Sequence, residues 1–386
     1  MAQVGTAVTR QEPAGATPSP VLPDYGGACL SEVVPTLMAR GALQEEGTLP
    51  SWLPPEVAGC RQVVLLVLDG LGAEQLATRR ATAPTLAAMA GGAITSVAPT
   101  TTSTALTSLV TGTPPARHGI VGYRFATRAG VLNVLRWTVG GRDARGAVPP
   151  EEVRRVPAFG GRAVPVVSRS EFQGSGFSES HMHGAKLVGW RMPSSLPVEV
   201  RRLLEAGEPF VYAYYDGVDK IAHETGLGEH YDAELQATDR LVADLAGVLP
   251  PGAALVVTAD HGQVEVRGDP IVLAPEIAHD VALLSGEGRF RWLHARPGAD
   301  GRVLEACREA YKDRAWVRHR DELVAEGWFG GPLAPEVAAR LGDVALVAFA
   351  PVCFYDPSDS GELRLIARHG SLTTAEALVP LRALWR

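Results

Sequence analysis

Apolar runs that stop at an acidic residue are the clearest pattern in the chain. Residues 63–68 are all Val or Leu and are followed by Asp69, and residues 253–259 are followed by Asp260 and His261. Continuous apolar, β-branched runs of this length predict buried strands of a parallel sheet. Ligands bind at the carboxyl ends of such strands. The acidic residues therefore mark a candidate site.

Strand patterns alternate with helical periodicity along the rest of the chain. Further strands are expected near residues 93–98, 164–167, 210–215 and 344–349. Helices are expected near residues 29–42, 73–80, 84–89, 196–204 and 232–249. This alternation predicts an α/β fold with a central, mostly parallel sheet sandwiched by helices.

One catalytic domain is expected to occupy residues 26–386. Residues 1–25 are rich in Pro, Ala, Thr and Gly without periodicity, which predicts a mobile tail. Residues 124–208 and 264–345 are expected to be insertions, the second forming a smaller α/β cap that shapes the pocket. Residues 172–177 are rich in glycine and predict an exposed loop within the first insertion.

A run of hydroxyl residues precedes the next predicted helix. Thr100, Thr101 and Thr102 come before apolar residues at helical spacing, and Gly112 has the position of a C-cap. A helix N-terminus also binds anions through its free N–H groups. The simpler interpretation of this run, capping alone, would be preferred if nothing else pointed to a site.

Metal-ligating residue types stand at four places, each just after an apolar strand or in a glycine turn. These are Asp69, Asp219 with His223, Asp260 with His261, and His369. Four residues separate Asp219 from His223, so one helical turn places both on one face. Asp and His are ordinary zinc ligands and also suit manganese or iron. Six ligands are too many for one tetrahedral ion but suit two ions.

Composition narrows the class of protein. The 386 residues carry a formal net charge of -7, which gives no support to binding of nucleic-acid polymers or anionic membranes. The four cysteines are widely separated, which predicts free thiols in a reducing compartment. No signal-peptide pattern or membrane-spanning run is present, so a cytoplasmic protein is expected. The oligomeric state stays open.

The order of these motifs resembles the alkaline phosphatase superfamily and, within it, the nucleotide pyrophosphatase/phosphodiesterase group. That group has an Asp after the first strand, a nucleophilic Thr or Ser, then D-x-x-x-H-x-x-G, D-H-G and a late H-G. The chain has Asp69, the Thr run, Asp219-x-x-x-His223-x-x-Gly226, Asp260-His261-Gly262 and His369-Gly370 in that order. Ser108 to Gly112, followed by His118-Gly119-Ile120, also matches and selects Thr102 as the nucleophile.

The resemblance implies a metal-dependent hydrolase of phosphodiester or pyrophosphate bonds in small, nucleotide-type substrates. Two divalent ions, expected to be zinc, would assist a covalent phospho-threonine intermediate. One ion would be held by Asp219, His223 and His369. The other would be held by Asp69, Asp260, His261 and the Thr102 hydroxyl. Tyr123 stands where the group usually carries an Asn that donates to a phosphoryl oxygen, and so becomes the candidate substrate-binding residue.

Other functions remain alternatives at this point. A phosphomonoesterase or phosphonate hydrolase would use the same site, and a binding protein of this fold would keep it without catalysis. A phosphoglycerate mutase of the cofactor-independent type would use a Ser nucleophile, and a sulfatase would need C-x-P-x-R or S-x-P-x-R around Thr102. A dehydrogenase and a P-loop kinase are excluded because neither glycine-rich motif is present.

Overall fold

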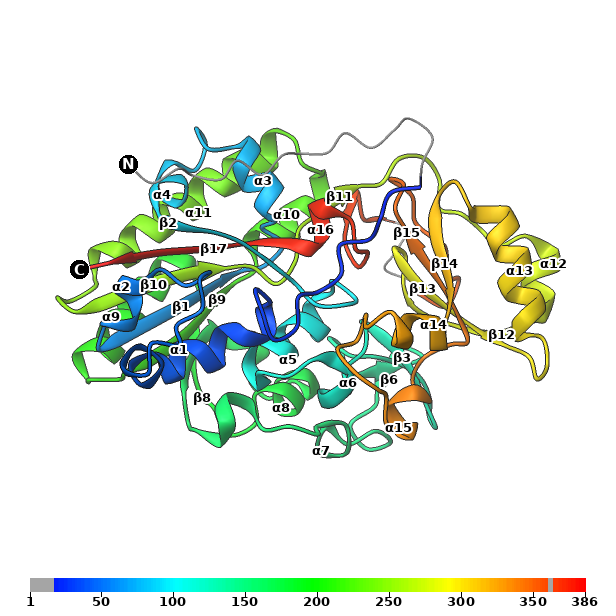
Figure 1. The fold of residues 1–386 in the computed structure, drawn as a ribbon, viewed down its shortest axis with the longest axis horizontal. Helices are drawn as coiled ribbons and strands as arrows, with labels where there is room; N and C mark the ends of the chain where they lie inside the picture. Colours follow the sequence, from blue (N-terminus) through cyan, green and yellow to red (C-terminus); the bar gives the residue numbers. More distant parts are fainter. Residues whose placement is uncertain (1–16, 360–363) are drawn as a thin grey trace.

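A seven-stranded mixed sheet forms the centre of the computed structural model, which describes residues 17–359 and 364–386 (Figure 1). The strand order is β2-β17-β10-β1-β9-β7-β8. The strands from β10 to β8 run parallel, whereas β17 is antiparallel to both β10 and β2. Their bounds are β1 (Gln62–Leu68), β2 (Ala90–Thr95), β7 (Pro165–Arg169), β8 (Lys186–Trp190), β9 (Phe210–Tyr215), β10 (Ala253–Thr258) and β17 (Leu378–Trp385). The predicted α/β fold with a mostly parallel sheet is confirmed.

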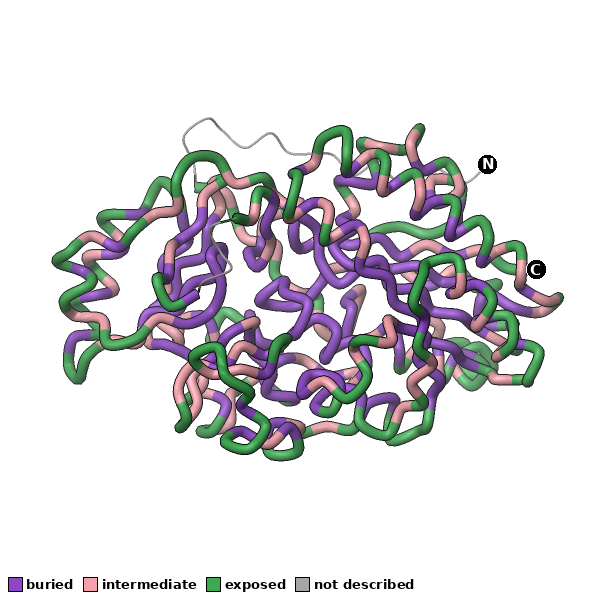
Figure 2. The backbone as a smooth tube through the Cα atoms, turned by 180° about the vertical axis from the view of Figure 1, so that it is seen from behind, coloured by how far each residue is buried: buried purple, intermediate pink, exposed green. Residues whose placement is uncertain are grey.

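Helices cover both faces of this sheet, which explains why its middle strands are almost wholly buried. One layer lies above the sheet in Figure 1 and contains α3 (Ala73–Thr78), α4 (Pro84–Ala88), α10 (Gly217–Thr225) and α11 (Glu229–Gly247). The opposite layer contains α1 (Leu30–Glu45), α5 (Thr102–Thr111) and α8 (Gly176–His181). Every residue of β9 and β10 is buried as a result (Figure 2). No helix in the described part of the chain is long and apolar enough to cross a membrane.

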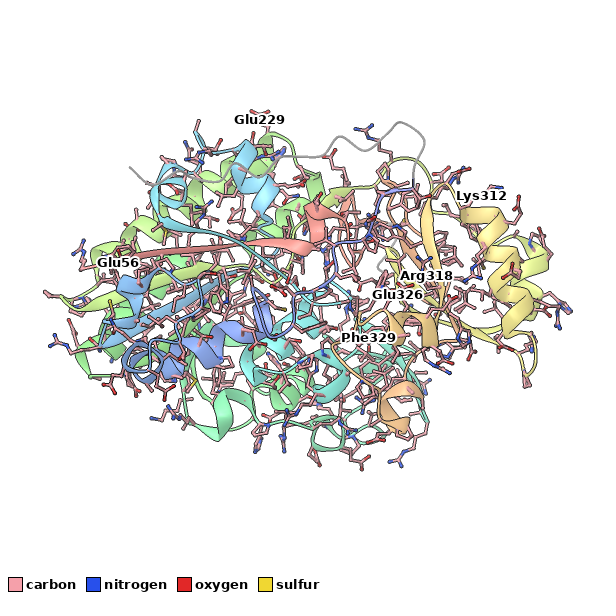
Figure 3. All side chains as sticks on the ribbon, viewed as in Figure 1. Glu56, Glu229, Lys312, Arg318, Glu326 and Phe329 are labelled. Atoms are coloured by element: carbon pink, nitrogen blue, oxygen red, sulfur yellow. The ribbon has the colours of Figure 1, made fainter. Side chains whose placement is uncertain are left out.

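A second sheet lies beyond the carboxyl edge of the first, with the strand order β12-β13-β15-β14. Its elements are β12 (Val281–Glu287), β13 (Phe290–Ala295), β14 (Ala315–His319), β15 (Val344–Ala348), α12 (Pro275–Asp280), α13 (Asp300–Tyr311), α14 (Arg320–Ala325) and α15 (Pro335–Ala338). Trp292 and Trp328 join one face of it to the main core, while α12 and α13 pack against the other. At its edge Arg318 pairs with Glu326, with 2.9 Å between Nε and Oε1 (Figure 3).

The two expected insertions differ in how they relate to the central sheet. Residues 281–348 form the second sheet, which places this structure almost wholly within the expected 264–345 segment. The expected 124–208 segment also supplies β7 and β8 of the central sheet. Only its first part forms a separate small sheet, made of β3 (Arg124–Thr127), β4 (Gly130–Asn133), β5 (Thr138–Val139) and β6 (Arg142–Asp143).

Two segments expected to be mobile or exposed are partly packed against the rest of the protein. In the part of the expected tail that the structure describes, the Val21 N–H donates to the Leu372 carbonyl at 2.8 Å, and the Tyr25 hydroxyl donates to the Trp328 carbonyl at 2.9 Å. Residues 1–16 lie outside the described residues. The expected exposed loop at 172–177 is exposed at Gln173 and Gly174, but its last two residues begin α8 and Phe177 is buried. Amino-acid composition alone does not reveal these tertiary contacts.

A buried ion pair connects the second sheet to the end of the central sheet. Arg289, in the turn between β12 and β13, donates to both carboxylate oxygens of Glu376 at 2.6 and 2.7 Å. Both side chains are fully buried. Glu376 belongs to α16 (Thr374–Ala377) and also accepts from the Ser371 N–H and the Thr373 hydroxyl. The pair therefore holds the second sheet at a fixed position beside the carboxyl ends of the parallel strands.

Removing one partner of this pair is expected to destabilise the protein strongly. Arg289→Ala leaves the Glu376 carboxylate buried without its cation, which costs about 3–5 kcal/mol. Urea unfolding followed by circular dichroism measures this loss. The matched control is Arg302→Ala, because Arg302 forms an exposed pair with Asp280 at 3.0 Å. That change should cost less than about 1 kcal/mol. Equal losses in the two variants would contradict the structural importance of the buried pair.

Candidate active site

Strand register brings the acidic residues of the candidate site to one edge of the sheet. β1 lies between β9 and β10, with Leu68 beside Tyr215 and Val67 beside Thr258. Asp69 therefore emerges next to the start of α10 and close to Asp260. Its own N–H donates to the Tyr215 carbonyl at 2.9 Å, which fixes this end of the strand.

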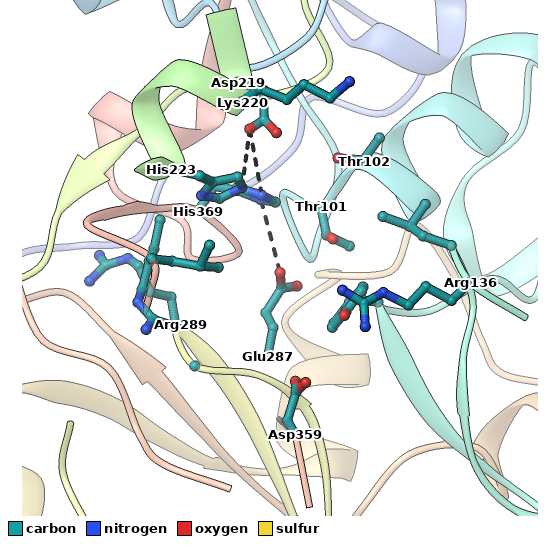
Figure 4. Close-up of a pocket in the computed structure, with 15 residues that line it drawn as sticks. Thr101, Thr102, Arg136, Asp219, Lys220, His223, Glu287, Arg289, Asp359 and His369 are labelled. Carbon is teal, nitrogen blue, oxygen red and sulfur yellow. Dashed lines mark ion pairs between the residues drawn. The ribbon is translucent and has the colours of Figure 1, made fainter. Parts of the chain in front are cut away.

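Helix α10 and the segment after β16 (Ala367–Arg368) bring a second group of candidate ligands to the same edge. Asp219 and His223 lie one turn apart on α10, with 3.3 Å between Asp219 Oδ1 and His223 Nε2. The same Asp219 oxygen lies 4.0 Å from Nε2 of His369. Figure 4 shows these three side chains together on one side of a cavity. The i,i+4 spacing seen in the sequence thus places both α10 residues on the cavity face.

The three histidines share one arrangement of their ring nitrogens. Nδ1 of His223 lies 2.7 Å from the Ala367 carbonyl, Nδ1 of His369 lies 2.8 Å from the Thr100 carbonyl, and Nδ1 of His261 lies 3.1 Å from the Gly262 carbonyl. A carbonyl can only accept, so Nδ1 carries the proton in each ring. Each Nε2 then keeps its lone pair, in the arrangement usual for metal-ligating histidines.

Two buried carboxylate oxygens in the cluster have no hydrogen-bond partner among the described residues. They are Oδ1 of Asp69 and Oδ2 of Asp260. They lie 3.4 and 3.5 Å from Nε2 of His261, whose proton is on its other nitrogen. Buried charges without a partner are rare because desolvation is costly. Divalent cations would satisfy both oxygens, so the residues present fit metal binding.

Burial and mutual repulsion shift the ionisation of these groups. Burial raises the pKa of Asp69 well above its usual value, and the carboxylates of Asp260 and Asp219 raise it further. Burial likewise raises the pKa of Asp219 and of Asp260. It lowers the pKa of His261, and it lowers the pKa of His369 well below the usual value. Protonation of these carboxylates therefore opposes metal binding as the pH falls.

Two groups of residues could each hold a metal ion, because the ligand atoms within each group all lie within 4.8 Å of one another. Asp219 belongs to both groups. The first contains Asp219, His223 and His369, the set expected for one ion. The second contains Asp69, Asp219 and His261. The sequence resemblance placed Asp260 in that second set and did not place Asp219 there. Asp260 is nevertheless adjacent, through its contact with His261.

Thr102 lies at the start of α5, beside the second set of ligand atoms. Its hydroxyl oxygen is 3.2 Å from Nε2 of His261. Thr101 is the N-cap, so the first N–H groups of the helix are free of intrahelical partners at this end. The preceding residue, Thr100, anchors the segment through a 2.7 Å hydrogen bond to the Ser371 carbonyl. The site thus combines a hydroxyl with a helix end that favours anions.

Three further hydrogen bonds to the carboxylates were not predicted from the sequence. The Tyr214 hydroxyl donates a short hydrogen bond to Oδ2 of Asp69, and the Gln263 amide donates to Oδ1 of Asp219 at 2.5 Å. The Gly70 N–H donates to Oδ1 of Asp260 at 3.1 Å. Gln263 directly follows the D-H-G motif, which is a signal the sequence offered. Tyr214 gave no such signal, because aromatic residues are common in buried strands.

Two cavities open at this cluster. The first, of about 400 Å³, is lined by Thr101, Thr102, Tyr123, Leu135, Arg136, Asp219, Lys220, His223, Glu287, Gly288, Arg289, Asp359, Leu365, Arg368 and His369. The second, of about 230 Å³, also reaches Thr102 and Asp69 and is lined by the aromatic residues Phe172, Phe177, Tyr212 and Tyr214. The turn between β12 and β13 supplies one wall of the first cavity, so the second sheet helps to shape it (Figure 4).

The sheet, its flanking helices and the ligand cluster at its carboxyl edge define an alkaline phosphatase-like hydrolase. The model of the type I phosphodiesterase/nucleotide pyrophosphatase family matches residues 63–374. The chain belongs to this family and is an enzyme that hydrolyses phosphoric esters or related bonds. No curated protein matches the sequence.

Solved structures show the same fold at low sequence identity. Murine ectonucleotide pyrophosphatase/phosphodiesterase 5 is 15% identical, with 84% of this chain and 88% of that chain covered and a TM-score of 0.64. Phosphonoacetate hydrolase from Sinorhizobium meliloti 1021 is 19% identical, with 84% and 90% covered and a TM-score of 0.60. The human counterpart of the murine protein is 14% identical, with 83% and 87% covered and a TM-score of 0.62.

Metal binding is expected to stabilise the protein in a pH-dependent way. The three carboxyl groups have raised pKa values in the folded, metal-free protein, so their protonation at low pH stabilises that folded state. That contribution is lost as the pH rises from their unfolded pKa of about 4 through the raised values. A bound cation offsets the loss. Added Zn²⁺ or Mn²⁺ should therefore raise the melting temperature of metal-depleted protein more at pH 8 than at pH 6.

Differential scanning fluorimetry after chelation measures this shift. At a metal concentration of 100 times the Kd, the gain is about 2.7 kcal/mol for one site. Asp69→Asn should reduce the gain, whereas Asp244→Asn, on an exposed position of α11, should not. A gain of equal size at both pH values, or one unchanged in Asp69→Asn, would argue against this site.

Proposed function

We propose that this protein is a metal-dependent hydrolase that cleaves phosphodiester or pyrophosphate bonds in small, nucleotide-type substrates. Thr102 is the proposed nucleophile and forms a covalent phospho-threonine intermediate. The observation that carries the proposal is the position of its hydroxyl. It lies at a helix N-terminus, in the first cavity, and 3.2 Å from a ring nitrogen of the ligand cluster.

Seven residues are proposed to hold two divalent ions. Asp219, His223 and His369 would bind one ion, and Asp69, Asp260, His261 and the Thr102 hydroxyl would bind the other. The closeness of Asp219 to both sets supports a compact two-ion site. When bound, such ions lower the pKa of a coordinated hydroxyl and neutralise charge on a phosphoryl group. Zinc suits a set of histidines and carboxylates, with manganese or iron as alternatives.

The chain's own groups account for the remaining requirements of phosphoryl transfer. The Thr102 oxygen would form a bond to phosphorus while the bond from phosphorus to the leaving oxygen breaks. Water would then cleave the phospho-threonine ester and restore the hydroxyl. The N–H groups in the first turn of α5, where Thr102 lies, would stabilise negative charge on the phosphoryl oxygens.

The second cavity supports a substrate with a flat, largely apolar part. Phe172 and Tyr214 lie with ring centroids 6.1 Å apart, and Phe177 lines the same space. Ser168 and Ser178 add hydroxyl groups that can bind polar edges. A nucleobase has this combination of a planar face and polar edges. The murine relative was also solved as an inactive variant in complex with AMP, which supports the same substrate class here.

A phosphonate or a phosphomonoester is the second candidate substrate. Tyr123, rather than an Asn, lines the first cavity with Thr102, and one relative of the same fold was solved with phosphonoacetate. Tyr123 is the proposed substrate-binding residue in either case. A cytoplasmic location is also part of the proposal, because four widely separated cysteines are typical of proteins from a reducing compartment.

Loss of the Thr102 hydroxyl is expected to abolish turnover. Thr102→Ala should lower kcat for bis(p-nitrophenyl) phosphate by at least roughly a thousandfold, because no nucleophile remains. Thr102→Ser, which keeps a hydroxyl, should retain a measurable rate. Elemental analysis should find up to two divalent ions per chain in both variants. Full activity in Thr102→Ala would exclude this residue as the nucleophile.

A substrate panel separates the two candidate classes. A diester, a dinucleotide, a monoester and a phosphonate are compared by kcat/KM with added Zn²⁺ or Mn²⁺. The proposal expects the diester or the dinucleotide to have the highest value. Phe177→Ala should lower kcat/KM for the dinucleotide more than for the monoester, because only the former fills the aromatic cavity. A clear preference for the phosphonate would favour the second candidate.

A further inference from the structure

Two polar side chains at the small β3–β4 hairpin contact each other, and one of them, Tyr123, lines the first cavity. Tyr123 directly precedes β3, and Asn133 is the last residue of β4. The antiparallel register pairs Arg124 with Asn133, and the Val134 N–H donates to the Tyr123 carbonyl at 2.9 Å. The hairpin backbone therefore fixes the two residues beside each other across the strands.

The hydrogen bonds of Asn133 define the direction of the contact between the side chains. Its Oδ1 accepts from the Arg136 backbone N–H at 3.0 Å, so the amide nitrogen must be the atom that faces Tyr123. That nitrogen, Nδ2, lies 2.6 Å from the Tyr123 hydroxyl oxygen and has only protons to offer. The Tyr123 oxygen is thus the acceptor, and its own proton is left for another partner.

The Tyr123 hydroxyl can donate that proton to a group bound in the first cavity. Tyr123 lines it together with Thr101 and Thr102, and within the described residues the bond from Asn133 is the hydrogen bond that its hydroxyl makes. Burial raises the pKa of Tyr123, and the nearby Asp359 carboxylate raises it further. The phenol therefore stays protonated at neutral pH and acts as an uncharged donor.

We propose that Asn133 is a positioning residue that holds the Tyr123 hydroxyl so that it donates to a non-bridging oxygen of the phosphoryl group reacting at Thr102. This inference rests on the proposed function. Asn133 does not touch the substrate and acts only by occupying the acceptor side of the phenol. The donor is fixed before substrate arrives, which is the condition under which a hydrogen bond stabilises a transition state efficiently.

A double-mutant cycle tests whether Asn133 acts through Tyr123. Tyr123→Phe should lower kcat by roughly tenfold to a hundredfold with little change in KM, because the bond strengthens as charge develops on the phosphoryl oxygen. Asn133→Ala should lower kcat by about tenfold. In the Tyr123→Phe background, Asn133→Ala should change kcat by less than about twofold. Independent effects that multiply in the double variant would overturn the inference.

An isosteric substitution separates positioning from space filling. Asn133→Asp keeps the shape and the bond from the Arg136 N–H, but a carboxylate cannot donate to the phenol. It would accept the Tyr123 proton instead and turn it away from the cavity. This variant should therefore lose about as much kcat as Tyr123→Phe. A rate equal to that of the unsubstituted protein would overturn the inference.

A control on the same hairpin accounts for general loosening. Thr127 donates to the Gly130 carbonyl at 2.7 Å in the hairpin turn, away from the Tyr123–Asn133 pair. Thr127→Ala should leave kcat within about twofold while lowering the melting temperature slightly. A loss of kcat in Thr127→Ala as large as in Asn133→Ala would show that hairpin order, rather than the pair, matters, and the inference would fall.

Failure of the proposed function can be told apart from failure of this inference. If the metal-loaded protein hydrolyses none of the panel, the hydrolase proposal fails on that result. The role of the Tyr123–Asn133 pair is then tested by calorimetric titration with orthovanadate, because the binding of this oxyanion can be measured without turnover. Tyr123→Phe and Asn133→Asp should each weaken its Kd by roughly tenfold. Unchanged Kd values in both variants would overturn the role of the pair.

Discussion

Burial of three carboxylates at one edge of the sheet is the constraint on which the site depends. Asp69, Asp219 and Asp260 lie together, and their pKa values are raised by burial and, for Asp69 and Asp260, by repulsion from neighbouring carboxylates of the cluster. Such an arrangement is costly without positive charge nearby. Register between β1 and β10 sets the positions of Asp69 and Asp260, and helix α10 sets the position of Asp219. The proposed pair of divalent ions would offset this cost by supplying positive charge.

The rest of the fold keeps this cluster in place and limits access to it. Backbone carbonyls fix the orientation of all three imidazoles, so their free nitrogens face the cluster. The buried Arg289–Glu376 pair holds the second sheet against the edge where the strands end. That sheet contributes a cavity wall, and the small hairpin contributes another through Tyr123. Selectivity would therefore depend on elements that lie outside the central sheet.

Much of the architecture could be predicted because its signals are local. The strand ending at Asp69, the strand before Asp260 and the helix capped by Gly112 all follow from apolar runs, periodicity and turn residues. The fold of segment 124–208 is harder to predict, because a short apolar run looks the same in a strand of the main sheet and in a strand of an insertion. Residues 17–25 were expected to be mobile, and only contacts such as that of Tyr25 show them packed.

The sequence by itself determined which candidate ligand types the site contains and the order in which they occur, because those depend on motifs a few residues long. Only the tertiary structure decided how they combine. It brought Asp219 close to both ligand sets, placed Gln263 and Tyr214 against the carboxylates, and paired Asn133 with Tyr123. Each of these contacts depends on strand register, hairpin geometry or helix packing, and distances between segments far apart in the chain are not encoded in any short stretch of it.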